Sequence, residues 1–148
     1  MARFRFNLEK VLRMRERIEK DWEAKLAEIT GRCARVQQRI LDNKQFAADS
    51  LKNRAAEEMT FENLSYSELY IQRMREENVR FAAELKVLEK KRLEVQQKYL
   101  EASRDRKAIQ KIKDKKEQEF KNLQAKKEEL AVDDINNSAK ARNYLGGW

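Results

Sequence analysis

From Ile71 to Leu130, one side of the chain follows a heptad pattern in which steps of three and four residues alternate. The positions are Ile71, Met74, Asn78, Phe81, Leu85, Leu88, Arg92, Val95, Tyr99, Ala102, Arg106, Ile109, Lys113, Lys116, Phe120, Leu123, Lys127 and Leu130. A helix of about 60 residues spans about 90 Å, which is far too long for a compact domain. Such a helix must bury its narrow apolar stripe against another helix. The pattern therefore predicts a rod with a mechanical or adaptor function.

The first part of the chain carries a second heptad pattern. It runs through Leu8, Leu12, Arg15, Glu19, Trp22, Leu26, Ile29, Cys33, Val36, Ile40, Asn43 and Ala47. Capping-type residues cluster between the two patterns, and Ser65 with Glu68 has the spacing of a capping box. We expect a helix over 7–58, a turn over 59–66, a helix over 67–135 and a flexible tail over 136–148. The predicted fold class is all-α, with two long helices forming a single antiparallel coiled-coil hairpin. A parallel dimer of one continuous helix would ignore the capping residues.

The hairpin predicts a register between its two helices. With the turn centred near residue 62, residues whose numbers sum to about 121–125 lie opposite one another. This rule places Val36 opposite Leu88, and Asn43 or Ala47 near Asn78. It also predicts an ion pair between Glu19 and Arg106. Polar residues inside a coiled-coil seam lower stability but fix the register.

The second helix is expected to outlast the first, leaving the stretch from about Phe120 onward with little or no partner in the same chain. Lysines at seam positions, such as Lys116 and Lys127, make this end a weak core. Two interpretations stay open, namely fraying toward the terminus and docking on another protein. Self-association through this end is also compatible with the sequence.

The composition argues against enzyme chemistry. The 148 residues include no histidine, no proline, three glycines and one cysteine, and 41% of them are charged. A His-based triad or an ordinary Cys/His zinc site cannot be built, and no nucleotide-binding loop is present. We therefore expect no catalysis, no cofactor and no metal. Cys33 lies on the apolar stripe, where it is expected to be a small buried hydrophobe. No apolar stretch has the length of a signal peptide or a membrane span, so we expect a cytosolic protein.

The positive charge is unevenly distributed. The net charge is +8, and residues 103–127 contain ten Lys or Arg against four Asp or Glu. A run of this kind is either a solvated face or a contact for an acidic protein surface, an anionic membrane or nucleic acid. Nucleic acid is not expected as a partner, because acidic residues interrupt the run and no aromatic residues interleave it.

Aromatic residues gather around the predicted turn. Phe81 fits the seam, whereas four others lie off it, namely Phe46, Phe61, Tyr66 and Tyr70. Some of these could staple the turn, and the others would be exposed. Exposed aromatic side chains at the tip of a rod indicate a contact site.

Three stretches resemble the flagellar FliJ family. The opening Phe4-Arg5-Phe6 with Leu8-Glu9-Lys10-Val11-Leu12 resembles the family's N-terminal signature. Residues 104–117 are similar to its basic C-terminal half, and Glu128-Glu129-Leu130 with Asp133-Asp134-Ile135 resembles its acidic C-terminal motif. The Asn136-Asn137 pair departs from the family pattern, in which ordinary helix formers are expected at these positions.

The resemblance implies a non-enzymatic component of the flagellar type III protein export apparatus. It implies an antiparallel coiled coil that acts as central stalk of the hexameric export ATPase. It further implies contacts with the cytoplasmic domain of the membrane export gate and with export chaperones, at the cytoplasmic face of the inner membrane. On this basis the ATPase-contact candidates are Arg13, Arg15, Arg104, Arg106, Lys107 and Lys111. The export-gate-contact candidates are Phe46, Phe61, Tyr66 and Tyr70.

Other classes of protein remain open from the sequence. The stalk of a virulence type III secretion system or of a rotary ATPase has the same architecture, although the opening motif argues against both. A generic coiled-coil scaffold needs only the heptads. A basic nucleic-acid-binding rod would show steeply salt-dependent DNA binding.

Overall fold

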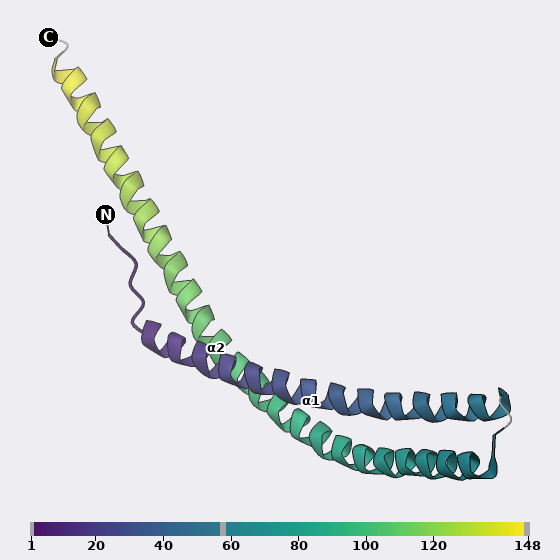
Figure 1. Cartoon of the computed structure of the whole chain (residues 1–148). Helices are drawn as coiled ribbons and strands as arrows, with labels where there is room; N and C mark the ends of the chain where they lie inside the picture. Colours follow the sequence, from purple (N-terminus) through teal and green to yellow (C-terminus); the bar gives the residue numbers. More distant parts are fainter. Residues whose placement is uncertain (1, 57–58, 147–148) are drawn as a thin grey trace. The chain divides into compact units, whose positions relative to one another are not determined.

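A computed structural model describes residues 2–56 and 59–146, which form two α-helices and, within that part of the chain, no strand. Helix α1 spans Glu9–Ala56 and helix α2 spans Phe61–Leu145. The two helices run antiparallel and pack against each other (Figure 1). The predicted all-α hairpin is therefore confirmed.

The first helix begins with backbone hydrogen bonds rather than with a side-chain cap. The Glu9 N–H donates to the Phe6 carbonyl at 3.2 Å, and the Leu12 N–H donates to the Leu8 carbonyl at 2.9 Å. Glu9 lies in the first turn and Arg54 in the last turn. Both charges have the sign that the helix dipole favours.

Helix α2 begins earlier than expected. Thr60 caps it, because its Oγ1 accepts a hydrogen bond from the Asn63 N–H at 3.3 Å. The predicted capping box of Ser65 and Glu68 is wrong, since both residues lie inside the helix. Instead, the Glu68 carboxylate accepts a hydrogen bond from Arg54 at 2.9 Å.

Helix α2 also ends later than expected. The sequence predicts a flexible tail over 136–148, but the helix continues through Asn136 and Asn137 to Leu145. The chain has no proline, and no glycine occurs between Gly31 and Gly146. Nothing in the local sequence is therefore strong enough to end the helix before Gly146, whose N–H donates to the Arg142 carbonyl at 2.8 Å.

The contacts along the hairpin gather in two compact units. The central unit comprises residues 18–102, and the terminal unit comprises residues 1–17 together with 103–148. Each unit is built from a part of both helices. The predicted pair of Glu19 and Arg106 has one member in each unit and stays a prediction.

The core of the central unit is a narrow apolar seam. Cys33, Val36 and Leu88 are buried, with exposed fractions of 4%, 8% and 9%, and Ile29, Ile40, Phe81 and Leu85 pack against them. Burying one such aliphatic side chain contributes about 1.5–3 kcal/mol. The predicted contact of Val36 with Leu88 and the predicted burial of Cys33 are confirmed.

A polar pair interrupts this seam and confirms the predicted register. The Asn43 Nδ2 donates to the Asn78 Oδ1 at 3.0 Å and also to the Glu77 carboxylate at 3.1 Å. The Asn78 Nδ2 in turn donates to the Ile40 carbonyl at 3.4 Å. Asn43 and Asn78 sum to 121, as the register rule requires.

The terminal unit combines a fully buried aliphatic side chain, Leu12 at 2% exposed, with ion pairs between its helices. The Lys113 Nζ lies 2.9 Å from the Glu9 carboxylate, and the Arg15 Nη1 lies 3.4 Å from that of Asp105. The rings of Phe4 and Phe120 are tilted against each other with centroids 5.6 Å apart. The expectation that Phe120 has little or no partner in the chain is therefore wrong.

The seam of the terminal unit departs from the heptad pattern after Lys113. The half-buried positions become Glu117, Phe120 and Gln124, whereas Lys116 is exposed and Leu123 is 58% exposed. These steps of four, three and four make an eleven-residue repeat, whose average of about 3.67 residues per turn needs no left-handed supercoil. From residue 125 to residue 145 every side chain is exposed, so the stretch without a partner begins after Gln124.

Candidate functional site

All six ATPase-contact candidates belong to the terminal unit. Helix α1 contributes Arg13 and Arg15, and helix α2 contributes Arg104, Arg106, Lys107 and Lys111. Four of them are exposed and available to a partner, namely Arg13, Arg104, Lys107 and Lys111. The side chain of Arg13 is 76% exposed, and its 3.9 Å ion pair with Glu9 restrains it only weakly.

The remaining two candidates take part in the packing of the helices. Arg15 is half-buried beside Asp105, and its Nε is buried without a hydrogen-bond partner. Arg106 is half-buried and already engaged in an interaction. Their substitution would therefore disturb the hairpin as well as any binding surface.

The start of the chain extends this basic surface. Arg3 and Arg5 line an open cavity of about 430 Å³ together with Phe4, Phe6, Glu9, Arg13 and Lys113. The contact of Phe4 with Phe120 ties this segment to α2. The sequence pattern indicated the opening motif but not that its arginines would join the candidates on α2.

The four gate-contact candidates belong to the central unit, near the ends of the helices that residues 57–60 connect. Phe46 and Tyr70 pack edge to face across the two helices with centroids 5.6 Å apart. Phe61 and Tyr66, by contrast, are 84% and 71% exposed. The first two therefore staple the hairpin, and the last two are free for a contact.

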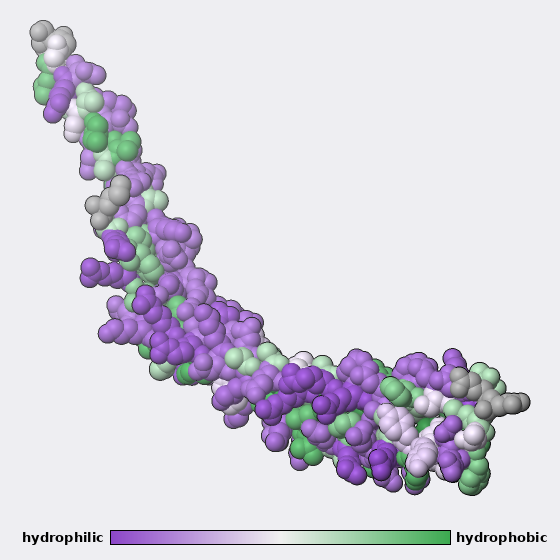
Figure 2. Space-filling view, in the orientation of Figure 1, coloured by the Kyte–Doolittle hydropathy of each residue, from purple (hydrophilic) through white to green (hydrophobic). Residues whose placement is uncertain are grey.

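A third surface, which the sequence reasoning missed, lies in the middle of the central unit. Arg32, Arg35 and Arg39 line a groove of about 340 Å³ whose apolar floor is Val36, Phe81 and Leu88, with Glu84 on its α2 side. We call this the arginine groove. The three arginines follow the spacing i, i+3 and i+7 beside the predicted seam, which is the signal that could have revealed it. Figure 2 shows hydrophobic patches between hydrophilic side chains over the two helices of this unit.

Neither metal binding nor membrane insertion is indicated in the described part of the chain. Residues 2–56 and 59–146 hold no group of three or more acidic or cysteine side chains placed to bind a metal ion. Neither α1 nor α2 contains a stretch long and apolar enough to cross a membrane.

These surfaces on a helical hairpin define a class of protein that acts through contacts along its helices. The family model described as flagellar FliJ protein matches residues 4–144 of the 148-residue chain. The chain therefore belongs to the FliJ family, whose members are non-catalytic components of the flagellar protein export apparatus. No curated protein matches the chain, and no solved structure matches it.

Proposed function

We propose that the chain is a non-enzymatic stalk and adaptor of the hexameric flagellar export ATPase. In this proposal the terminal unit contacts the ATPase, and the central unit contacts the cytoplasmic domain of the membrane export gate. Export chaperones are further partners, and the protein works at the cytoplasmic face of the inner membrane. Family membership supports the flagellar export apparatus over the stalk of a virulence secretion system or a rotary ATPase.

The observation that carries the proposal is the separation of the two candidate sets. The exposed basic candidates lie in the terminal unit, and the exposed aromatic candidates lie in the central unit. A protein with two chemically different contact surfaces is suited to connect two partners. Basic side chains provide electrostatic steering toward an acidic surface, and exposed aromatic side chains provide anchors for an apolar one.

The test of the ATPase contact reads the ATPase rate and ring formation of the export ATPase from the same organism, with and without this protein. The variant combines Arg104→Glu, Lys107→Glu and Lys111→Glu, because these three side chains are exposed. Arg106 is left intact, since it is half-buried and engaged. The expected result is stimulation by the native chain and at least a tenfold weaker effect of the variant at about 0.1 M salt.

A matched control separates a local contact from net charge. Lys86→Glu, Lys90→Glu and Lys91→Glu change the net charge by the same amount on exposed positions of the central unit. This control is expected to stimulate like the native chain. Equal loss in both variants would indicate a nonspecific charge effect, and no stimulation by the native chain would refute the stalk assignment.

The gate contact is tested on the two freely exposed aromatic residues. Phe61→Ala with Tyr66→Ala is expected to weaken binding to the cytoplasmic domain of the gate without changing the melting temperature. The stapling pair provides the control, because Phe46→Ala with Tyr70→Ala removes a ring contact and should lower the melting temperature. Unchanged gate binding and motility after alanine substitution at all four positions would refute this assignment.

A further inference from the structure

The arginine groove has binding groups that the hairpin itself does not satisfy. The Arg32 Nη2 lies 3.1 Å from the Glu28 carboxylate, and the Arg39 Cζ lies 5.7 Å from the centroid of the Phe81 ring. Arg35 has no ion-pair partner among the described residues. Between these three cations and Glu84 the floor of the groove consists of half-buried Phe81 and of Val36 and Leu88, which keep exposed fractions of 8% and 9%. The groove therefore fits a ligand that combines acidic and apolar side chains.

The only interior glycine lies beside the same groove. A Cβ added at Gly31 would meet only the Arg35 Nη1, at 3.8 Å, which is an ordinary van der Waals contact. The hairpin thus has no steric need for glycine here, although glycine in a helix costs about 1 kcal/mol relative to alanine. A backbone without a side chain at this point lets another helix approach closely.

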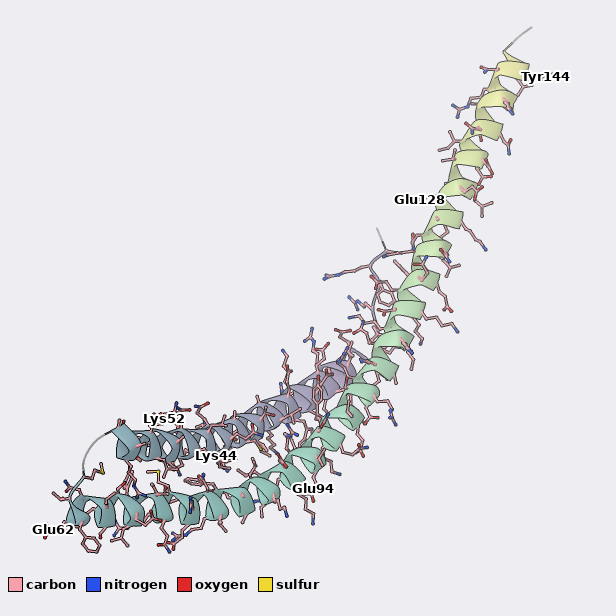
Figure 3. The ribbon with its side chains drawn as sticks, turned by 90° about the vertical axis from the view of Figure 1, so that its right-hand side faces the viewer. Lys44, Lys52, Glu62, Glu94, Glu128 and Tyr144 are labelled. Atoms are coloured by element: carbon pink, nitrogen blue, oxygen red, sulfur yellow. The ribbon has the colours of Figure 1, made fainter. Side chains whose placement is uncertain are left out.

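The acidic segment of the chain, residues 128–135 on α2, carries a charge opposite to that of the arginine groove. Its carboxylates are Glu128, Glu129, Asp133 and Asp134, all exposed and all without an ion-pair partner among the described residues. Its apolar side chains are also exposed, with Leu130 at 63%, Val132 at 54% and Ile135 at 67%. Figure 3 shows no other element beside α2 from Glu128 to Tyr144.

We propose that the acidic segment of one copy docks into the arginine groove of a second copy. Val132 and Ile135 lie on one side of the helix because they are three residues apart, and Glu128 and Glu129 lie about one turn before Val132. The same spacing of three relates Arg32 to Arg35. Docked together, the apolar side chains cover the floor of Val36, Phe81 and Leu88 while the carboxylates meet the guanidinium groups.

A second copy explains these features better than a small anion does. An isolated phosphate would use the arginines but would make no apolar contact with the half-buried Phe81. The docking joins two different surfaces, so it is heterologous and leaves one groove and one segment free for further copies. The association is therefore concentration-dependent, and it is sensitive to salt because its charges are exposed. It does not rest on the proposed ATPase or gate contacts.

Sedimentation velocity of the full-length chain tests the docking with two charge-reversed variants. The groove variant carries Arg32→Glu, Arg35→Glu and Arg39→Glu. The segment variant carries Glu128→Lys, Glu129→Lys and Asp133→Lys. The expected result is that the native chain self-associates as its concentration rises, and that each variant alone associates at least about tenfold more weakly. The Lys86, Lys90 and Lys91 reversal matches the charge change of the groove variant and should associate like the native chain.

Mixing the two variants gives the decisive result. The segment of each variant then faces a groove of the opposite charge on the other, so the equimolar mixture is expected to regain association. Raising the salt from about 0.1 M to about 1 M should weaken it, since the screening length falls from about 10 Å to about 3 Å. A native chain that stays monomeric would overturn the proposal. So would association that neither variant weakens, or two weakened variants that do not rescue each other. The segment variant alters only fully exposed positions, so its result stands even if the groove variant folds poorly.

Discussion

The Asn43–Asn78 pair is predicted to hold the register of the central unit, and a double-mutant cycle measures its strength. The variants are Asn43→Ala, Asn78→Ala and the double substitution. Asn43 donates two hydrogen bonds, at 3.0 Å to Asn78 and at 3.1 Å to Glu77. Asn78 accepts the first of these and donates a longer bond of 3.4 Å to the Ile40 carbonyl. Of these three hydrogen bonds, only the one between the two amides is lost in both single variants.

The magnitude follows from these bonds. A hydrogen bond contributes about 0.5–1.5 kcal/mol net, and long or exposed bonds lie near the lower end. Asn43→Ala is therefore expected to cost about 1–2 kcal/mol and Asn78→Ala about 1 kcal/mol. The double variant loses the shared bond only once, so the coupling energy should be about 0.5–1.5 kcal/mol.

Urea unfolding of a Trp148→Phe background provides the assay. Trp22 is then the single tryptophan of the chain, and it is half-buried in the central unit that contains the asparagine pair. Its fluorescence reports the unfolding of that unit, and circular dichroism at the same urea concentrations tests for two-state behaviour. The free energy of unfolding must fall with urea concentration at the same slope in all four proteins of the cycle, so that the differences can be assigned to stability.

A second pair of substitutions tests the register itself. Asn43→Leu with Asn78→Leu is expected to raise the free energy of unfolding and to broaden the distribution of oligomers, because leucine permits alternative pairings that asparagine disfavours. A coupling energy of zero, together with a leucine variant that stays as uniform as the native chain, would refute the register role.

Three further predictions concern stability. Gly31→Ala should raise the free energy of unfolding by about 0.5–1 kcal/mol in urea, since its new Cβ meets only the Arg35 guanidinium; a loss of stability would show an unseen steric constraint. Cys33→Ser should lower it by about 1–3 kcal/mol, because the 4% exposed thiol would be replaced by a hydroxyl in the apolar core; in the native chain a thiol reagent should react only as fast as the unit opens. At a protein concentration too low for self-association, removal of residues 125–148 should reduce the helical signal but leave the urea midpoint of Trp22 unchanged, since the side chains from 125 to 145 are all exposed; a shifted midpoint at that concentration would reveal contacts of that segment with the hairpin of its own chain.

The heptad pattern was sufficient to predict the fold and the register of the central unit. From Ile71 to Ala102 every position of the pattern is buried or half-buried, and Glu89 is the one further half-buried residue, because apolar residues there occur at nearly every seam position. Beyond Lys113 the heptad pattern no longer identifies the half-buried positions. Lys116 and Glu117 are equally polar, so hydropathy could not show that the burial moves from one to the other. Phe120 fits both registers, and its partner Phe4 lies outside the helices.

The helix ends were predicted less well, because several residues competed for the same role. Thr60 and Ser65 are both good caps, and the choice between them depends on a distant contact. Arg54 donates to Ser67 at 3.0 Å and to Glu68 at 2.9 Å, and α2 already covers both of these residues. At the other end, Asn136 and Asn137 each disfavour a helix by well under about 1 kcal/mol, which neighbouring alanines and charged helix formers offset.

The candidate surfaces were predicted by residue type but not by availability. The sequence identified the basic and aromatic residues, yet it could not separate exposed Arg104 from half-buried Arg106, or free Tyr66 from the stapling Tyr70. Whether such a residue is exposed or packed depends on its exact position relative to the seam, and a shift of one position along the helix is enough to change it. The arginine groove could have been predicted from the sequence, because the seam fixes the face of α1 on which its arginines lie.

The two units differ in what stabilises them, and this difference bears on how the protein binds. The central unit buries an aliphatic seam, whose side chains each contribute about 1.5–3 kcal/mol. The terminal unit buries Leu12 and adds partly exposed ion pairs such as Arg15 with Asp105, which contribute at most about 1 kcal/mol each. Among the described residues the terminal unit has one buried apolar side chain and the central unit has five, so we expect the terminal unit to open at a lower free-energy cost. Since it also carries the exposed basic candidates, a partner that binds them would stabilise the part of the hairpin that the chain itself holds least firmly.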